Sequence, residues 1–105
     1  MAKDECVFCK IISEEIPTEF VHKDSDLLVF KDIRPKAAVH LLIVPREHIE
    51  TFLDLGDKHF SLLTKVIKVI QRLIKEQKLT AGYRVMINGG RHQEVKHLHF
   101  HLLGD

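Results

Sequence analysis

The stretch His97-Leu98-His99-Phe100-His101-Leu102-Leu103 decides how this chain folds, because histidine alternates in it with apolar residues. Side chains of a β-strand alternate between two faces, so a strand here would present all three imidazoles on one face. The apolar residues between them would face the opposite way, toward a core. A helix over the same stretch would place His99 roughly opposite the other two histidines and leave neither face consistent. The pattern therefore predicts a strand with one histidine face and one buried face.

Two ordinary explanations of this histidine face are weaker than a reaction surface. A single histidine on a strand is usually a partly buried residue with satisfied hydrogen bonds, but three in register are harder to explain in that way. A metal centre built from all three is also disfavoured. A straight strand separates His97 from His101 by roughly 13 Å at Cα, whereas a metal–nitrogen bond is about 2 Å long. Two neighbouring histidines with ligands from elsewhere could still share an ion.

Composition narrows the classes of function. The chain has 105 residues, which suits a single domain over residues 1–105. Sixteen basic and fifteen acidic residues nearly balance, so charge gives no argument for a nucleic-acid partner or a membrane surface. Residues 1–5 include three charged side chains, unlike the apolar run of a secretion signal, and no apolar run is long enough to span a membrane. Cys6 and Cys9 lie too close together for a disulfide framework, so we expect a reduced, cytoplasmic setting.

Five strands and two helices are predicted along the chain. The strands are expected at residues 19–23, 27–31, 39–44, 83–87 and 97–103, and a short helix or turn at 6–13. A long amphipathic helix follows from apolar residues spaced three and four apart between Phe60 and Ile74, with Asp57 as its N-cap and Gly82 ending the unit. The order β-β-β-α-β-β with short connections favours an α+β fold, an antiparallel meander with a helix packed on it.

The histidine face is suited to chemistry at phosphorus. Imidazole can act as a nucleophile or as an acid near neutral pH, and a phosphoryl-histidine bond forms and hydrolyses readily. The loop Asn88-Gly89-Gly90 precedes the histidine strand and could cradle a phosphate with backbone N–H groups. Asn-Gly is also the commonest hairpin turn. His40 could support the histidines from a neighbouring strand, or be structural.

The segment HLHFHLL resembles the signature of the histidine triad nucleotide-binding family, in which three histidines alternate with apolar residues. The likeness extends over nearly the whole chain, through CVFCKIISEEIP, FKDIRPKAAVHLLIVPREHI, YRVMING and QEVKHLHFHLLG. These segments follow the order of the small Hint-like branch. The resemblance implies a five-stranded antiparallel sheet with one long and one short helix. It also implies a two-fold dimer that joins two such sheets through the long helix and the strand at 83–87.

The resemblance also implies a reaction. His99 would be the nucleophile that attacks the α-phosphorus of a purine nucleotide or nucleotide conjugate, forming a nucleotidyl-histidine that water then resolves. His101 would contact the phosphate and assist the leaving group, while His97 and His40 would support the proton network. The implied reaction is hydrolysis of a nucleoside 5′-phosphoramidate with release of AMP or GMP, without an organic cofactor.

The same resemblance implies a nucleotide site. Asp32 would hold both ribose hydroxyls through its two oxygens, although it would also suit a surface turn, and Ile33 would touch the sugar and base. The implied apolar base pocket, whose members would equally suit core packing, consists of Phe8, Ile11, Ile16, Phe30 and Leu42. The implied phosphate-side loop carries Asn88, Gln93 and Glu94.

The two cysteines raise the question of a metal. Cys6-x-x-Cys9 has the spacing of zinc ligands, but two cysteines alone are a weak signal. Some bacterial members of the family pair such cysteines with two histidines, whose positions here are His48 and His97. The resemblance therefore implies a structural zinc ion at these four residues. The alternative is a reduced pair without metal that buries a thiol.

Two features depart from the family pattern. The loop between Asn88 and His97 is shorter than in many relatives and lacks the Gly-Gly before Gln93. The sequence ends at Asp105, where many relatives continue with a tail that influences substrate choice. The alternatives are a dinucleoside polyphosphate hydrolase, a nucleotide-binding or protein-interaction module with little catalysis, and a catalytic zinc enzyme that would lose activity on chelation.

Overall fold

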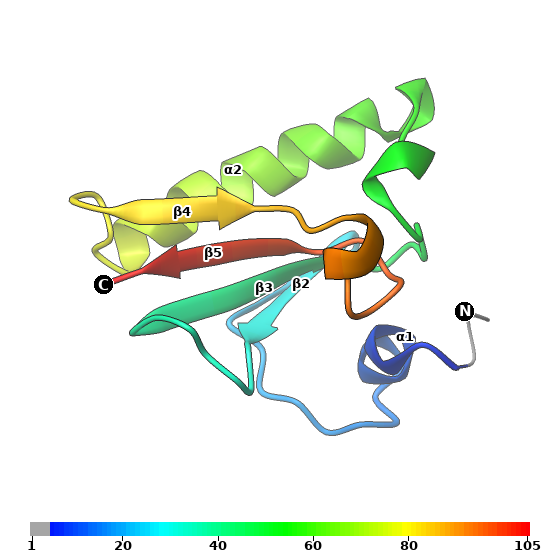
Figure 1. Ribbon diagram of the computed structural model, residues 1–105, viewed down its shortest axis with the longest axis horizontal. Helices are drawn as coiled ribbons and strands as arrows, with labels where there is room; N and C mark the ends of the chain where they lie inside the picture. Colours follow the sequence, from blue (N-terminus) through cyan, green and yellow to red (C-terminus); the bar gives the residue numbers. More distant parts are fainter. Residues whose placement is uncertain (1–4) are drawn as a thin grey trace.

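Five strands form one antiparallel sheet in the order β1-β2-β3-β5-β4 (Figure 1). The computed structural model describes residues 5–105; residues 1–4, which make up most of the charged N-terminal segment considered above, lie outside the described residues. The strands are β1 His22–Lys23, β2 Leu27–Lys31, β3 Val39–Pro45, β4 Tyr83–Met86 and β5 Phe100–Gly104. The predicted α+β class with five antiparallel strands is confirmed.

The predicted meander is correct for β1 to β3 and wrong for the last two strands. Instead of lying next to β3, β4 forms the edge of the sheet, and β5 pairs with β3 on one side and β4 on the other. The burial of the two strands explains why β5, and not β4, lies next to β3. Every residue of β5 is buried, which suits a central strand, whereas most of β4 is exposed, which suits an edge.

The histidine strand is also shorter than predicted. β5 begins at Phe100, so His97 and His99 precede the ladder, and the N–H of Leu98 donates to the carbonyl of Ile49 instead (2.6 Å). The alternation of faces nevertheless continues through this stretch. The apolar residues of the stretch pack into the core with the long helix, as predicted: Leu98, Phe100 and Leu102.

The long helix α2 spans Phe60–Glu76, so its predicted start and end are both displaced. Asp57 does not cap it but begins the 3-10 turn η3 (Asp57–His59), and buried His59 occupies the N-cap position. At the other end the chain leaves the helix before Gly82. Lys78 adopts a left-handed conformation (φ 58°), and the N–H of Leu79 closes the helix end on the carbonyl of Ile74 (2.8 Å).

The two helices cover opposite faces of the sheet. On one face, α2 contributes Val66, Ile70, Leu73 and Ile74 to an apolar cluster with β2, β3 and β5. On the other face, the short helix α1 (Val7–Ile12) packs in a second apolar cluster with side chains of β2 and β3. The predicted apolar stripe of α2 is therefore only partly correct, because Phe60 and Ile67 are exposed. No helix in residues 5–105 combines the length and the apolar character that crossing a membrane would need.

Candidate functional site

His99 lies on the side of the sheet that α1 covers, in contact with Phe8 of that helix. Its side chain is buried and its ring lies edge-on to Phe8, with centroids 4.9 Å apart, and 4.9 Å from the ring of His101. Nδ1 of His99 lies 2.7 Å from the carbonyl oxygen of His97. A carbonyl only accepts, so the proton of a neutral His99 lies on Nδ1 and the lone pair on Nε2.

The surroundings of His99 favour the neutral ring. Burial lowers the pKa of His99, and this effect exceeds the opposing influence of the bond to the His97 carbonyl and of the charges on Asp32 and Glu94. Those two carboxylates act on the ring all the same. They would stabilise a positive charge that developed on it after Nε2 had formed a bond.

His40 and His101 form a directed pair across β3 and β5. The backbone N–H of Lys36 donates to Nδ1 of His40 (3.2 Å), so neutral His40 carries its proton on Nε2. That nitrogen lies 2.9 Å from Nδ1 of His101, which must accept, and the proton of neutral His101 is therefore on Nε2. Burial and the charges of His99 and His40 lower the pKa of His101 to about 4. The free protein thus presents His101 as a neutral hydrogen-bond donor.

Asp32 stands beside this pair. Its Oδ1 accepts from the N–H of Arg34 (2.8 Å), and its Oδ2 lies 3.5 Å from Nε2 of His40. The ligand atoms of Asp32, His40 and His101 lie close enough to share a metal ion. To bind one, Nε2 of His40 would have to give up its proton to Nδ1, which already faces the N–H of Lys36. The trio is better suited to moving protons than to binding a metal.

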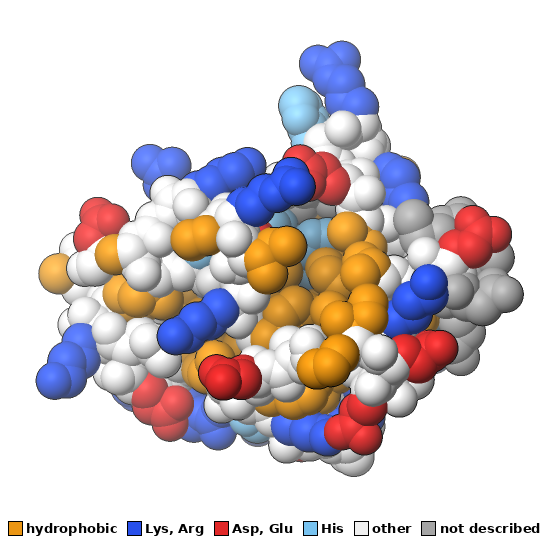
Figure 2. Space-filling view, turned by 90° about the horizontal axis from the view of Figure 1, so that it is seen from below, with side chains coloured by type: hydrophobic (Ala, Val, Ile, Leu, Met, Phe, Trp, Pro, Cys, Tyr) orange, Lys and Arg blue, Asp and Glu red, His pale blue; other side chains and the backbone are white. Residues whose placement is uncertain are grey.

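The structure brings together the apolar residues that the sequence assigned to a base pocket. All five lie in the cluster under α1, four of them buried and Ile16 half-buried: Phe8, Ile11, Ile16, Phe30 and Leu42. Figure 2 shows this side of the molecule, with hydrophobic side chains gathered around a hollow in which histidine is visible. Ile33 is not part of the cluster, since it is 92% exposed beside Asp32.

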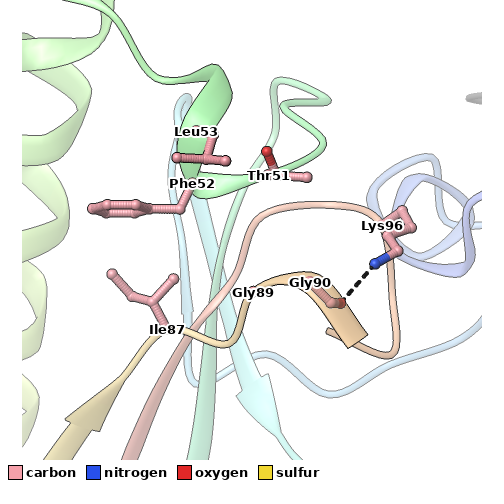
Figure 3. A pocket seen from close by; sticks show the side chains of 7 residues that line it. All are labelled: Thr51, Phe52, Leu53, Ile87, Gly89, Gly90 and Lys96. Atoms are coloured by element: carbon pink, nitrogen blue, oxygen red, sulfur yellow. Dashed lines mark hydrogen bonds between the residues drawn. The ribbon is translucent and has the colours of Figure 1, made fainter. Parts of the chain in front are cut away.

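The phosphate-side loop contains one residue in contact with the histidines. The side-chain amide of Asn88 lies beside His101, with its Nδ2 3.3 Å from Nε2. With the amide turned over, its Oδ1 would take this place and accept the proton that Nε2 carries. Gly90 has φ +58°, a conformation that favours glycine, and Nζ of Lys96 donates to its carbonyl (3.0 Å). This bond fixes the loop beside an open pocket of about 580 Å³, lined partly by Phe52, Leu53 and Ile87 (Figure 3).

Gln93 and Glu94 differ in their placement. The side chain of Gln93 is buried, and its Nε2 donates to the carbonyls of Glu50 (2.7 Å) and Val95 (3.0 Å). Its Oε1 is buried without a hydrogen-bond partner among the described residues. Glu94 is exposed, close enough for its charge to act on His99. Gln93 therefore anchors the segment, whereas Glu94 is open to a ligand.

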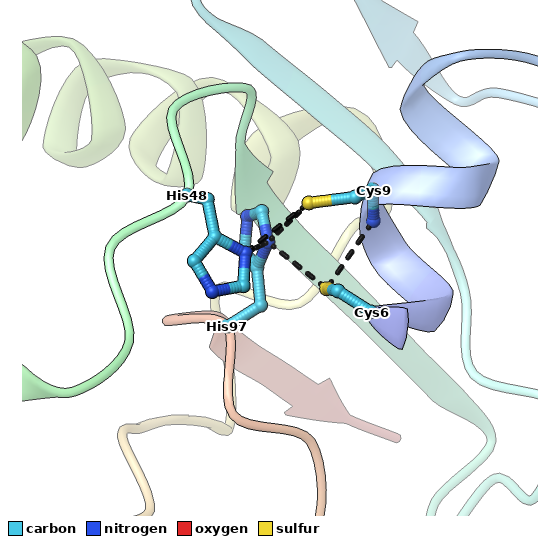
Figure 4. Close-up of side chains that lie close together, drawn as sticks. All are labelled: Cys6, Cys9, His48 and His97. Atoms are coloured by element: carbon cyan, nitrogen blue, oxygen red, sulfur yellow. Dashed lines mark hydrogen bonds between the residues drawn. The ribbon is translucent and has the colours of Figure 1, made fainter. Parts of the chain in front are cut away.

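The four residues assigned to a metal site do converge, from the N-terminal end of α1, from the segment after β3 and from the segment before β5 (Figure 4). Sγ of Cys6 lies 3.4 Å from Nδ1 of His97, and Sγ of Cys9 lies 3.1 Å from Nδ1 of His48 and 3.6 Å from Nδ1 of His97. The two Nδ1 atoms are 3.2 Å apart. A tetrahedral zinc ion with ordinary bond lengths separates its sulfur and nitrogen ligands by about 3.3–3.8 Å. All four separations lie within about 0.2 Å of that range, so the spacing of the four atoms is close to what zinc requires.

Hydrogen bonding supports His97 as a ligand, whereas Nε2 of His48 is buried without a hydrogen-bond partner among the described residues. Nε2 of His97 lies 2.7 Å from the carbonyl of Pro45, so its proton is on Nε2 and the lone pair of Nδ1 faces the cluster. Metal-binding histidines are usually oriented by such a bond on the other ring nitrogen. Two cysteines and two histidines form one of the common structural zinc sets.

Three contacts could not be found from residue types. They are the Pro45 carbonyl on His97, the Lys36 N–H on His40, and the ring of Phe8 against His99. Two involve backbone atoms, which any residue supplies. Phe8 was assigned to the base pocket, and its spacing in the sequence carries no sign that it touches a histidine 91 positions later.

Comparison with known proteins gives consistent matches. The family model described as scavenger mRNA decapping enzyme C-term binding matches residues 5–105. Protein HitA of Neisseria gonorrhoeae is 40% identical over 103 residues, covering 96% of each chain. The purine nucleoside phosphoramidase of Escherichia coli (strain K12) is 39% identical over 104 residues, which covers 96% of this chain and 87% of that protein.

Solved structures agree with these relatives. A HIT family hydrolase from Legionella pneumophila Philadelphia 1 is 43% identical with a TM-score of 0.91, covering 94% of this chain and 91% of that chain. A histidine triad protein from Clostridium difficile is 39% identical with a TM-score of 0.92, covering 100% of this chain and 94% of that chain.

Proposed function

Because this chain belongs to the histidine triad (HIT) family, with HIT family hydrolases among its relatives, we propose that it hydrolyses purine nucleoside 5′-phosphoramidates through a nucleotidyl-histidine intermediate. The observation that carries the proposal is the bond from Nδ1 of His99 to the carbonyl of His97. It leaves Nε2 of a neutral imidazole as a nucleophile. The 39% identity to a purine nucleoside phosphoramidase supports the choice of substrate.

The nucleotide would extend from the apolar cluster under α1 to the neighbouring histidines. The purine would enter the apolar cluster that includes Phe8 and Ile11, and the ribose hydroxyls would reach the Oδ2 side of Asp32. The α-phosphate would then lie next to His99 and His101, because both rings face the same hollow.

In the first step Nε2 of His99 attacks the α-phosphorus, and the bond from phosphorus to the leaving nitrogen breaks. The leaving nitrogen takes up a proton from solvent and departs as an amine, since an unprotonated amide is a poor leaving group. Nε2–H of His101 donates to a phosphate oxygen, and His40 holds His101 in the required tautomer. The charges of Asp32 and Glu94 stabilise the positive ring of the intermediate.

In the second step water attacks the phosphorus, and the phosphorus–His99 bond breaks. The electron pair of that bond returns to Nε2, the water gives up a proton to solvent, AMP or GMP is released, and His99 returns to its neutral form. A dinucleoside polyphosphate would follow the same path with a nucleotide as the leaving group, so the substrate must be decided by measurement.

The nucleophile is tested by His99→Ala. We expect at least a roughly thousandfold loss of phosphoramidase activity, and loss of the nucleotidyl adduct that mass spectrometry detects on the wild type. His22→Ala is the matched control, because His22 lies on β1 at the far edge of the sheet. Activity that survived in purified His99→Ala would refute the mechanism. A panel with simple amine phosphoramidates and dinucleoside polyphosphates would identify the preferred leaving group.

We also propose a structural zinc ion bound by Cys6, Cys9, His48 and His97. The zinc ion would link α1 to the histidine segment. It would not take part in the reaction, because four protein ligands leave no coordination position open. Thiolate ligands persist in a reducing compartment, and we place the protein in the cytoplasm for that reason.

Metal analysis tests the site. We expect close to one zinc ion per chain after purification without chelator, and a lower melting temperature after chelation. Cys9→Ser should reduce both the zinc content and the stability. A content below about 0.2 zinc per chain would contradict the proposal. Chelation that abolished turnover while leaving the fold intact would favour the alternative of a catalytic zinc enzyme.

The partner we propose besides the nucleotide is a second copy of the chain. Both α2 and β4 carry exposed apolar residues, and β4 forms an edge of the sheet. Pairing of two such edges would protect them and extend the sheet.

A further inference from the structure

The short helix α1 contributes to both proposed sites. Cys6, its N-cap, and Cys9, in its first turn, point toward the metal cluster. Phe8 and Ile11 belong to the apolar cluster proposed to hold the base. The position of this one helix therefore decides whether either site is complete.

Phe8 lies between the two cysteines in sequence and touches the histidines of both sites. Its ring is edge-on to His97 with centroids 5.9 Å apart and edge-on to His99 at 4.9 Å. It also packs on Phe30 at 5.7 Å. Only 6% of Phe8 is exposed, so moving α1 outward would open all three contacts together.

A second connection runs through His97 itself. Nδ1 of His97 faces the cysteines, and the carbonyl of the same residue accepts from Nδ1 of His99. A ligand that fixes the ring of His97 thus acts on the residue that orients His99.

α1 has too little intrinsic stability to hold this position alone. It contains six residues, and isolated helices shorter than about 12–15 residues are marginal in water. Its docking depends on the apolar contacts of Phe8 and Ile11 and on the contacts of the two cysteines. Docked and undocked α1 are therefore two states, and any ligand that prefers the docked state shifts the balance toward it.

We propose that zinc at the cysteine–histidine cluster and a purine nucleotide at the histidine face bind cooperatively through the docking of α1, with Phe8 as the positioning residue. The inference rests on the proposed function, because it takes the zinc and nucleotide sites as given. Each ligand then raises the affinity for the other by the same factor. Nucleotide binding becomes sensitive to the metal state although zinc touches no part of the nucleotide.

The test measures both affinities in the full chain. AMP binding is measured by calorimetry on zinc-loaded and metal-free protein. The affinity for zinc is measured by equilibrium competition with a chromogenic chelator, starting from loaded protein, with and without AMP. We expect zinc to tighten AMP binding about tenfold and AMP to tighten zinc binding by the same factor. The competition starts from loaded protein, so it can be followed even where the metal-free chain does not stay folded.

Variants separate coupling from simple packing. Phe8→Ala should retain zinc and weaken AMP binding, while the ratio of AMP affinities with and without zinc falls toward one. Phe8→Leu, which keeps an apolar side chain of similar reach, covers the case in which the alanine variant does not fold. Phe20→Ala is the matched control, because Phe20 packs on Phe30 in the same cluster without a ring contact to a histidine. It should preserve the ratio.

The outcomes distinguish the inference from the proposals beneath it. Failure to bind AMP in any metal state, or failure to bind zinc, would overturn the proposed sites themselves. Binding of both ligands with affinities independent of each other would overturn the coupling alone. A ratio unchanged in Phe8→Ala and Phe8→Leu would remove Phe8 from the connection.

Discussion

Three polar groups of His97 each contact a different part of the protein. Its Nδ1 faces the two cysteines, its Nε2 donates to the carbonyl of Pro45, and its own carbonyl orients His99. The alternation of residues predicted that the histidines would share a face, and the resemblance added the metal. The bond to Pro45 could not be predicted, because it joins a ring to a backbone atom 52 residues away.

His101 gives the molecule a pH dependence of stability. Burial and neighbouring charges lower its pKa to about 4 in the folded protein, whereas an unfolded histidine titrates near 6.5. Between pH 4 and pH 6.5, His101 therefore binds a proton in the unfolded chain but not in the folded one. The contribution of His101 to the free energy of unfolding is therefore complete above pH 6.5. It falls by about 1–3 kcal/mol as the pH falls toward 4.

The measurement is urea unfolding at pH 7.5 and pH 5 for the wild type and for His101→Gln at equal metal content. The wild type should lose more stability than the variant over this range. Equal losses in the two proteins would show that His101 does not carry the effect.

At the scale of elements, the sequence predicted the strands better than their arrangement. Periodicity located all five strands to within about three residues, because alternation is a local property. The insertion of β5 between β3 and β4 depends on which strand is buried on both faces, and that is set by packing. Similarly, the spacing of apolar residues identified α2 but assigned Phe60 and Ile67 to the core, whereas the buried stripe runs through Val66 and Ile70.

The end of β5 meets the end of α2 at Gly104. A Cβ added to Gly104 would lie 2.6 Å from Cδ2 of buried Leu79, the residue that closes the helix. We expect Gly104→Ala to lower the free energy of unfolding by about 1–3 kcal/mol, since a packed contact must shift. Gly82→Ala is the control, because nothing lies within 4 Å of its added Cβ. Denaturant unfolding measures both, and equal stabilities would contradict the packing argument.

At the scale of the whole molecule, the two sides of the sheet carry different kinds of side chain. One side, under α1, carries the histidines, the cysteines and the apolar cluster. The outer face of α2 and the edge strand β4 carry exposed apolar side chains instead: Phe60, Ile67, Tyr83 and Val85. Both lie along the upper side of the molecule in Figure 1.

We expect the wild type to sediment as a dimer at micromolar concentration. Ile67→Glu should yield a monomer, because the side chain is 56% exposed on α2 and a charge there would be buried by a partner. Val21→Glu makes a comparable change beside β1, at the opposite edge of the sheet, and should leave the dimer intact. A monomeric wild type in analytical ultracentrifugation would refute the dimer.

The central position of β5 has a consequence for the order in which the protein folds. Each pair of partners between β3 and β5, such as His40 and Leu103, is separated by about sixty residues along the chain. Closing so long a loop costs entropy before any contact rewards it, so strand pairs of this kind form slowly. The turns of α2 and the hairpin β1–β2 need no such closure. During refolding, the circular dichroism signal of the helix should recover before catalytic activity does. Activity would report only those chains in which β5 has paired with β3.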